Sequence, residues 1–306
     1  MKKFLSLICL ICYILTLSVS AQGIVMFDKT NPFTGDGVSV KMVAADKIQF
    51  ANEKDVLAAQ RNLNDCTRST NQQEQIDLLI LQAASSSGEE RERIINELES
   101  YGVYRYPTEV INRPTSRSQN SDVVINAPDI YYTTGDQTWT VATGGYWRNE
   151  NWKKDVTITS IGGNVGGVDG FGVGYSNTGG TYKTYVVRNT GAINNGKTGA
   201  EHEGIITSNR SDGDGKLGFG FQMQDTFGYS ENSGPIQYIG SGWAGSATYS
   251  RDFGYYSGIA TSYYVHTWDD AKLNSVSFTV GDSNTISFDI SFKESSFKAY
   301  GSDTRF

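Results

Sequence analysis

A stretch toward the C-terminal end of the sequence alternates between apolar and polar side chains with a period of two. Val276, Phe278 and Val280 alternate with serine and threonine, and the alternation resumes at Ile286 after a turn sequence at 281–284. Successive side chains of a β-strand point to opposite faces of the sheet. The pattern therefore predicts an antiparallel hairpin with one apolar and one polar face.

Similar short alternating runs occur through the C-terminal half of the sequence, at 139–141, 156–158, 182–187 and 259–268. Clusters of glycine and asparagine separate them, as expected for turns. This half holds 29 of the 34 glycines and 29 of the 37 aromatic residues. Many short strands joined by glycine-rich turns predict a mainly β fold, with an antiparallel β-sandwich or jelly roll over 129–306.

Two of these runs place glycine at every other position, at 170–175 and at 218–221. One face of each predicted strand then carries no side chain, while the other carries aromatic and apolar residues. A bare face allows another strand, a loop or a ligand to approach the backbone closely. We expect the aromatic residues to fill the core and the glycines to lie beneath a crossing segment.

The sequence before residue 107 has helical rather than strand periodicity. Apolar residues recur at i, i+3 and i+4 over 55–63, 75–84 and 89–101, which predicts amphipathic helices. Ser87 and Glu90 have the spacing of a capping box for the last of these helices. Residues 22–106 are therefore predicted to form a small helical N-terminal region.

A polar segment that contains three prolines joins the two halves. Residues 107–128 include Pro107, Pro114 and Pro128 with a run of serine, threonine, arginine and asparagine between them. Such a segment is typical of a linker. The helical region before it is then a separate unit, either a propeptide or a stalk, and the sequence favours neither.

The beginning of the chain has the pattern of a secretory signal peptide. Positive residues precede an apolar run from Phe4 to Leu17, and small residues precede Gln22. The pattern predicts a signal peptide over 1–21 and a secreted, extracellular protein. The apolar run has about 14 residues, fewer than the ~20 that cross a bilayer, so we expect no stable membrane span in the mature protein. Cleavage would leave Cys66 as the single cysteine.

The charge balance argues against a nucleic-acid partner. The chain has a formal net charge of −7 and a pI of about 5.0. An acidic chain without a basic run would be repelled by the phosphate backbone. Two histidines are also too few for a histidine-rich metal cluster.

An Asp-Gly repeat is the main candidate for a metal site. Asp212-Gly213-Asp214-Gly215 is similar to the start of a calcium-binding loop, but Lys216 stands where a third oxygen ligand is needed. Asp169 is the third candidate ligand, from a neighbouring segment. The sequence therefore suggests a Ca²⁺ site formed by these three aspartates, and a simple turn is the alternative.

Catalytic residues are harder to assign. His202 lies between two glutamates and His266 lies close to Asp269, but neither has the spacing of a known nucleophile or zinc motif. If these groups met in a cleft, the protein would be a secreted hydrolase that acts on an extracellular polymer. We assign no catalytic residue.

Clustered aromatic residues point instead to a binding function. Sugar rings have apolar faces and polar edges, so their sites combine flat aromatic side chains with hydrogen-bonding groups. The candidate ligand-binding residues are Trp147, Trp152, Trp243, Tyr255 and Tyr256. The sequence predicts a secreted, non-catalytic protein that binds a polysaccharide or cell-surface glycan. The alternatives are the hydrolase and, through the 276–292 hairpin, a pore-forming toxin.

Overall fold

The protein is mainly β and antiparallel in the part of the chain that a computed structural model describes. That part comprises residues 70–111, 121–155, 162–179, 186–194, 206–208, 211–212, 218–229, 236–269, 272–279, 285–291 and 295–306. The predicted signal peptide, the predicted helix at 55–63, the predicted strand at 156–158 and Cys66 lie outside these residues.

Seven of the described strands form a first sheet. They are β1 (Val103–Arg105), β3 (Val123–Ile125), β4 (Asp129–Thr133), β5 (Thr138–Trp147), β7 (Val186–Asn194), β8 (Ile206–Ser208) and β12 (Gly242–Tyr249). Their order in the sheet is β1-β4-β5-β12-β7-β8, and β3 pairs with β5. The strand predicted at 139–141 is thus the start of a longer central strand, β5.

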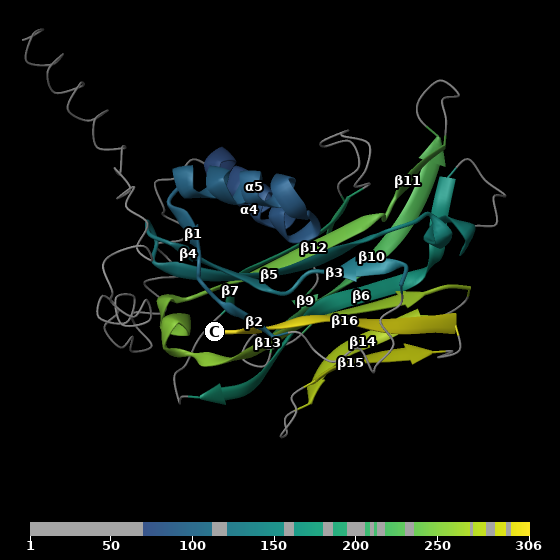
Figure 1. The fold of residues 1–306 in the computed structure, drawn as a ribbon. Coiled ribbons are helices and arrows are strands. Elements are labelled where there is room, and N and C mark those ends of the chain that lie inside the picture. Colours follow the sequence, from purple (N-terminus) through teal and green to yellow (C-terminus); the bar gives the residue numbers. More distant parts are fainter. Residues whose placement is uncertain are drawn as a thin grey trace, which may run out of the picture.

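A second sheet of seven described strands contains both glycine-alternating segments. Its strands are β2 (Glu109–Ile111), β6 (Gly162–Gly179), β9 (Ser211–Asp212), β10 (Gly218–Tyr229), β11 (Ile236–Ile239), β13 (Ser257–Thr267) and β16 (Ser296–Arg305). The order is β11-β10-β6-β13-β16-β2, and β9 pairs with β10. The long strands bend, so that the sheets curl like half of a barrel (Figure 1).

Aromatic rings from both sheets form one core. Trp243 of β12 stacks on Tyr264 of β13, with ring centroids 3.8 Å apart. Close by, Thr143 of β5 donates a hydrogen bond of 2.8 Å to Ser262 of β13. All four residues are buried, so central strands of the two sheets are in direct contact in the core.

The glycine-alternating strands lie side by side beneath a β-ribbon. β6 and β10 pair with Gly172 opposite Gly220, so their bare positions are adjacent. β14 (Lys272–Thr279) and β15 (Thr285–Ser291) form the predicted antiparallel hairpin and lie against β6. Gln222, which follows Gly220 on the same face, donates a hydrogen bond of 3.4 Å to the Leu273 carbonyl of β14. This contact brings β14 to the face that the alternating glycines leave bare, and the prediction that a crossing segment covers the glycines themselves stays a prediction.

Two described helices cover the first sheet, α4 (Thr70–Ser85) and α5 (Gly88–Ser100). They contain the predicted segment 75–84 and all of the predicted segment 89–101 except Tyr101, which caps α5. Ser87 precedes α5 as predicted, but its side chain makes no capping hydrogen bond, and the Glu90 carboxylate accepts from Arg93 instead. Gly102, with φ of +74°, lies just beyond the end of α5. No described helix is long and apolar enough to cross a bilayer.

The helices are part of the same folded body as the sheets. Figure 1 shows α4 and α5 lying across the first sheet. Leu98 of α5 is fully buried in a cluster that includes Tyr131 of β4 and Ala142 of β5. Arg91 of α5 also forms an ion pair of 2.5 Å with Asp129 of β4. The sheet buries the apolar faces of the helices, which a free stalk would leave exposed.

The described parts of 107–128 also differ from the predicted linker. β2 pairs with β16, and β3 pairs with β5, so this segment contributes a strand to each sheet. β1, within the predicted helical region, pairs with β4. The prediction of an unstructured linker is wrong for these residues. Each of the three strands has only three residues, which is too short for an alternating pattern to be recognised beside prolines.

Gly245 provides a test of the packing between the sheets. A Cβ atom there would lie 2.6 Å from the Phe221 ring and 2.7 Å from the Phe171 ring. We expect Gly245→Ala to lower the free energy of unfolding by about 1–3 kcal/mol because the core cannot accept the extra methyl group. Gly228→Ala is the control, since its Cβ would meet nothing within 4 Å. Equal losses in urea denaturation would contradict this packing.

Leu98 provides a test of whether helices and sheets unfold together. Leu98→Ala should lower the free energy of unfolding by about 2–5 kcal/mol, because it leaves a cavity between α5 and the first sheet. The exposed Asn96 supplies the control variant Asn96→Ala, with a change below about 0.5 kcal/mol. Far-UV and near-UV circular dichroism should report one shared transition. An early helical transition that spares the tryptophan signal would contradict the single folded body.

Candidate functional site

Three aspartates and one histidine lie together around the neighbouring strands β6, β10 and β13. Asp169, Asp225 and His266 come from these three strands in that order, and Asp155 ends the 3₁₀ helix η2 (Asn151–Asp155). Asp169, Asp225 and His266 each offer one ligand atom, and these three atoms lie within 4.8 Å of one another. These four residues are called the Asp-His cluster below.

Strand alternation directs the cluster into the interior. Asp169 lies two residues before the buried Phe171, and His266 lies two residues after the buried Tyr264. Asp225 likewise lies two residues after the buried Met223. Residues two apart in a strand share a face, so all three polar side chains continue apolar rows of the core face.

A β-bulge adjoins the cluster. The register between β10 and β6 shifts at Gln224 and Asp225, where Gly166 and Gly167 of β6 have no partner. Gly166 has φ of +60°, and a Cβ there would lie 2.7 Å from the Thr267 carbonyl oxygen. Gln224 fills the bulge, since its side-chain amide donates 3.0 Å to the Gly167 carbonyl. Bulges often reshape a sheet next to functional residues.

Asp169 is the most heavily hydrogen-bonded member of the cluster. Its carboxylate accepts from the Tyr264 hydroxyl at 2.7 Å and from the Thr267 backbone N–H at 2.8 Å. His266 Nδ1 lies 2.9 Å from the same carboxylate. Asp169 is 1% exposed, so these bonds replace the water that an ionised carboxylate needs.

His266 bridges two carboxylates. Nδ1 faces Asp169, and Nε2 lies 3.0 Å from the Asp155 carboxylate. Burial acts to lower the pKa of His266, but the charge of Asp169 and the hydrogen bonds to Asp155 and Asp169 raise the pKa to about 10. Without a metal, the ring is therefore an imidazolium at neutral pH that donates from both nitrogens.

Asp225 has a very different environment. It is 1% exposed, and neither carboxylate oxygen has a hydrogen-bond partner among the described residues. Its carboxyl group lies against Gly240, where a Cβ would be 2.4 Å from Oδ1. Burial, reinforced by the charge of Asp169, raises the pKa of Asp225 well above its ordinary range. The cluster thus combines one fully bonded carboxylate with one that lacks described partners.

The three tryptophans predicted to bind a ligand are buried. Trp147, Trp152 and Trp243 are 3%, 1% and 0% exposed. The Trp147 ring lies edge-on to His266 at 4.9 Å, so it forms a wall of the Asp-His cluster. The exposed aromatic platform predicted from these residues is not formed, because alternation and the turn at η2 direct the indoles inward. Within the segment 147–152, the polar residues between the two tryptophans reach the surface and the tryptophans do not.

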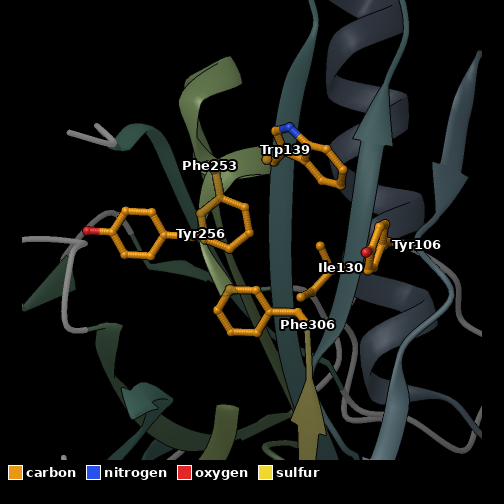
Figure 2. A pocket seen from close by; sticks show the side chains of 7 residues that line it. Tyr106, Ile130, Trp139, Phe253, Tyr256 and Phe306 are labelled. Carbon is orange, nitrogen blue, oxygen red and sulfur yellow. The ribbon is translucent and has the colours of Figure 1, made fainter. Parts of the chain in front are cut away.

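The predicted tyrosines lie at the other end of β13. Tyr256 is 8% exposed, and the half-buried Tyr255 packs against the core. Tyr256 borders a small apolar cavity of about 10 Å³, far below the ~300 Å³ at which ligand pockets usually begin. Figure 2 shows the Phe253 and Phe306 rings beside each other, and they stack with centroids 5.4 Å apart. The full lining is Tyr106, Ile130, Trp139, Phe253, Gly254, Tyr256 and Phe306.

The predicted Ca²⁺ ligands are only partly described. Asp214 lies outside the described residues, and Asp212 lies in β9, without a described side chain. Asp169 belongs to the Asp-His cluster. The prediction that these three aspartates share a Ca²⁺ ion stays a prediction.

The candidate catalytic groups are only partly described. Glu201 and His202 lie outside the described residues. Asp269 is exposed and accepts a hydrogen bond of 3.3 Å from Ser295, whereas the partners of His266 are Asp155 and Asp169. Sequence proximity was thus misleading for His266, because its true partners are about a hundred residues away in the chain.

An aromatic side chain that the sequence analysis passed over marks the surface next to the cluster. Trp268 is half-buried, with its ring 5.9 Å from His266 and 6.4 Å from Phe297. A Cβ at Gly166 would lie 3.4 Å from the Trp268 Cα and 3.5 Å from the Asp155 Cβ, so Trp268 and Asp155 flank this glycine. The signal was available, since Trp268 is the last residue of the alternating run at 259–268 and directly follows β13.

Tyr264 provides a test of the bonding around Asp169. Tyr264→Phe should lower the free energy of unfolding by about 1.5–3 kcal/mol, because it removes a buried hydrogen bond to a charged group. Tyr175→Phe is the matched control, since Tyr175 donates a buried bond of 2.9 Å to the neutral Tyr249 hydroxyl. Its expected loss is about 0.5–1.5 kcal/mol. Equal losses in chemical denaturation would contradict the stronger hydrogen bond expected between Tyr264 and Asp169.

Comparison with known proteins adds no assignment to this geometry. No known protein family matches the sequence, and no curated protein matches it either.

Proposed function

We propose that this chain is a secreted, non-catalytic protein that binds a polysaccharide or another glycan-bearing polymer. The proposed contact surface consists of Trp268, Asp155 and Asp269 and is called the Trp268 surface below. The observation that carries the proposal is the half-buried Trp268 ring beside two carboxylates that reach solvent. An aromatic face next to carboxylates matches the apolar faces and hydroxyl edges of sugars.

The neighbourhood of Trp268 supports a rigid binding surface. The Trp268 ring packs against Phe297 and His266, and these contacts hold part of the ring in place. Asp155 is fixed by its hydrogen bond to His266 while 23% of its side chain stays exposed. A ligand would meet groups that are already oriented, which reduces the entropy lost on binding.

The protonation of His266 supports a binding role over catalysis. A general base needs a nitrogen that can accept a proton within reach of a substrate. His266 donates from both nitrogens to carboxylates, and its side chain is 4% exposed. A hydrolase remains the second candidate because the exposed Asp155 lies beside this histidine and is the one cluster member that a substrate could touch.

Two further predictions belong to the same proposal. The signal-peptide pattern at 1–21 supports secretion to the extracellular space. The aromatic core shared by the two antiparallel sheets supports a β-sandwich scaffold, with the helices outside it. Such a scaffold would hold the Trp268 surface at the end of β13.

The test is a binding screen of the full chain on a glycan and cell-wall polysaccharide array. We expect Trp268→Ala to weaken binding about tenfold or more, since loss of a central aromatic contact commonly costs over 1 kcal/mol. Tyr255→Ala is the control, because Tyr255 is half-buried at the opposite end of β13. Melting temperatures of both variants should match that of the unmodified chain to within a few degrees.

Three outcomes would count against the proposal. Binding that survives Trp268→Ala, or that is lost only in Tyr255→Ala, would place the ligand elsewhere. Absence of any bound glycan would remove the polymer from consideration. Release of sugars that stops in Asp155→Asn would favour the hydrolase instead.

A further inference from the structure

The Asp-His cluster has a geometric property that the proposed function does not use. Asp169, Asp225 and His266 bring two carboxylates and an imidazole to within 4.8 Å, and all three residues are buried. Asp225 is 1% exposed, and neither of its oxygens has a described partner. Buried polar atoms are nearly always bonded, so two oxygens without a described partner on one side chain are available to bind a ligand.

The charges of the cluster lead to the same conclusion. Within the described residues, Asp169 and Asp155 form ion pairs with His266, whereas Asp225 forms none. Three carboxyl groups therefore surround a single imidazole. A carboxyl group in the interior needs a hydrogen-bonded partner or a cation, and the described surroundings of Asp225 provide neither.

We propose that the Asp-His cluster is a binding site for one divalent transition cation, with Asp225, Asp169 and His266 as the protein ligands. One carboxyl oxygen of Asp225 lies within 4.8 Å of a ligand atom of Asp169 and of His266. The inference does not depend on glycan binding.

The donor set favours an ion such as Zn²⁺ over Ca²⁺. Zinc accepts three protein ligands from imidazole and carboxylate groups, with ligand distances of about 2.0–2.2 Å. Calcium prefers about six to eight oxygen ligands, and the cluster offers an imidazole nitrogen and only two carboxylates at close range. The site therefore differs in residues and in chemistry from the Asp212, Asp214 and Asp169 site predicted from the sequence.

The site can accommodate the ion by a small local rearrangement. Separations of up to 4.8 Å between ligand atoms exceed the ~3.3 Å expected around tetrahedral zinc. Asp225 can close this gap, because no described hydrogen bond holds its carboxylate. Gly240 leaves the room that the carboxylate occupies, since any Cβ there would clash with it.

Binding of the cation displaces protons from the cluster. His266 holds a proton between its Nδ1 and Asp169, and a cation bound by that nitrogen takes its place. One proton passes to solvent from the imidazolium, and Asp225 releases another if it is protonated. The Nε2–H bond to Asp155 is retained and orients the ring, as carboxylates commonly do for metal-bound histidine.

The experiment uses the full chain stripped with chelator and then dialysed against Zn²⁺, Mn²⁺ or Ca²⁺. We expect one Zn²⁺ per chain by elemental analysis after removal of free metal. The melting temperature should rise by about 5–10 °C when free Zn²⁺ is a hundredfold above its dissociation constant. Co²⁺ in place of Zn²⁺ should give the visible absorption of a low-coordinate nitrogen-oxygen site.

Asp225→Asn is the decisive variant, because it has nearly the same shape but loses the charge. It should weaken Zn²⁺ binding at least a hundredfold and abolish the thermal shift. Asp303→Asn is the matched control, since Asp303 is 7% exposed and accepts a bond of 2.6 Å from Thr261 far from the cluster. This control should retain the Zn²⁺ shift. If Asp225→Asn does not fold, the smaller Asp225→Ser replaces it.

Specific results would overturn the proposal. The first is that the full chain takes up no transition cation. The second is that Asp225→Asn binds Zn²⁺ as tightly as the unmodified chain. The third is that the chain binds Ca²⁺ more tightly than Zn²⁺. The stripped chain and the Asp225→Asn variant could also be equally stable and take up no metal. That result would show that Asp225 simply carries a proton. Since none of these readouts involves glycan, failure here would leave the Trp268 surface untouched.

Discussion

The buried carboxylate of Asp169 is the constraint on which this end of the structure depends. It cannot lie in the interior without donors, and the donors come from β13 through Tyr264, Thr267 and His266. The hydrogen bonds to the Asp169 carboxylate fix the position of β13 along β6 and orient the imidazole ring of His266. The orientation in turn brings Nε2 to Asp155 and holds η2 against the sheet. Asp225 lies beside this network without a described partner, which is why the cluster suggests a ligand as well as a structural support.

The strands and helices with long periodic patterns could be predicted from the sequence, and the short ones could not. The hairpin of β14 and β15, the paired glycine strands and helix α5 all carry patterns that extend over several residues. β1, β2 and β3 have three residues each, and their pairing depends on partners far away in the sequence. Nothing local in 107–128 could show that its residues complete both sheets, so its prolines suggested a linker.

The alternation that predicts the strands did not make the candidate site recognisable, because the cluster residues occupy the same core-facing rows as apolar residues. Extending the core-facing rows by two residues, from Phe171, Met223 and Tyr264, leads to Asp169, Asp225 and His266. Sequence reasoning treated Asp169 as part of a loop and paired His266 with its nearest acid. It also assigned Trp147 and Trp243 to the surface, although aromatic residues on central strands belong to the core when both faces of the sheet are covered. Which strands become neighbours depends on topology, which one sequence does not reveal.

The pairing of β2 with β16 has a consequence for how the chain reaches its final form. Arg305 and Glu109, which face each other across this pair, are 196 residues apart. β16 also supplies the partner strand for β13 from Ile259 to Thr267. Contacts of such long range form slowly, because a large loop must close before they are made. During synthesis, this edge of β13 is therefore left unpaired until β16 has been made.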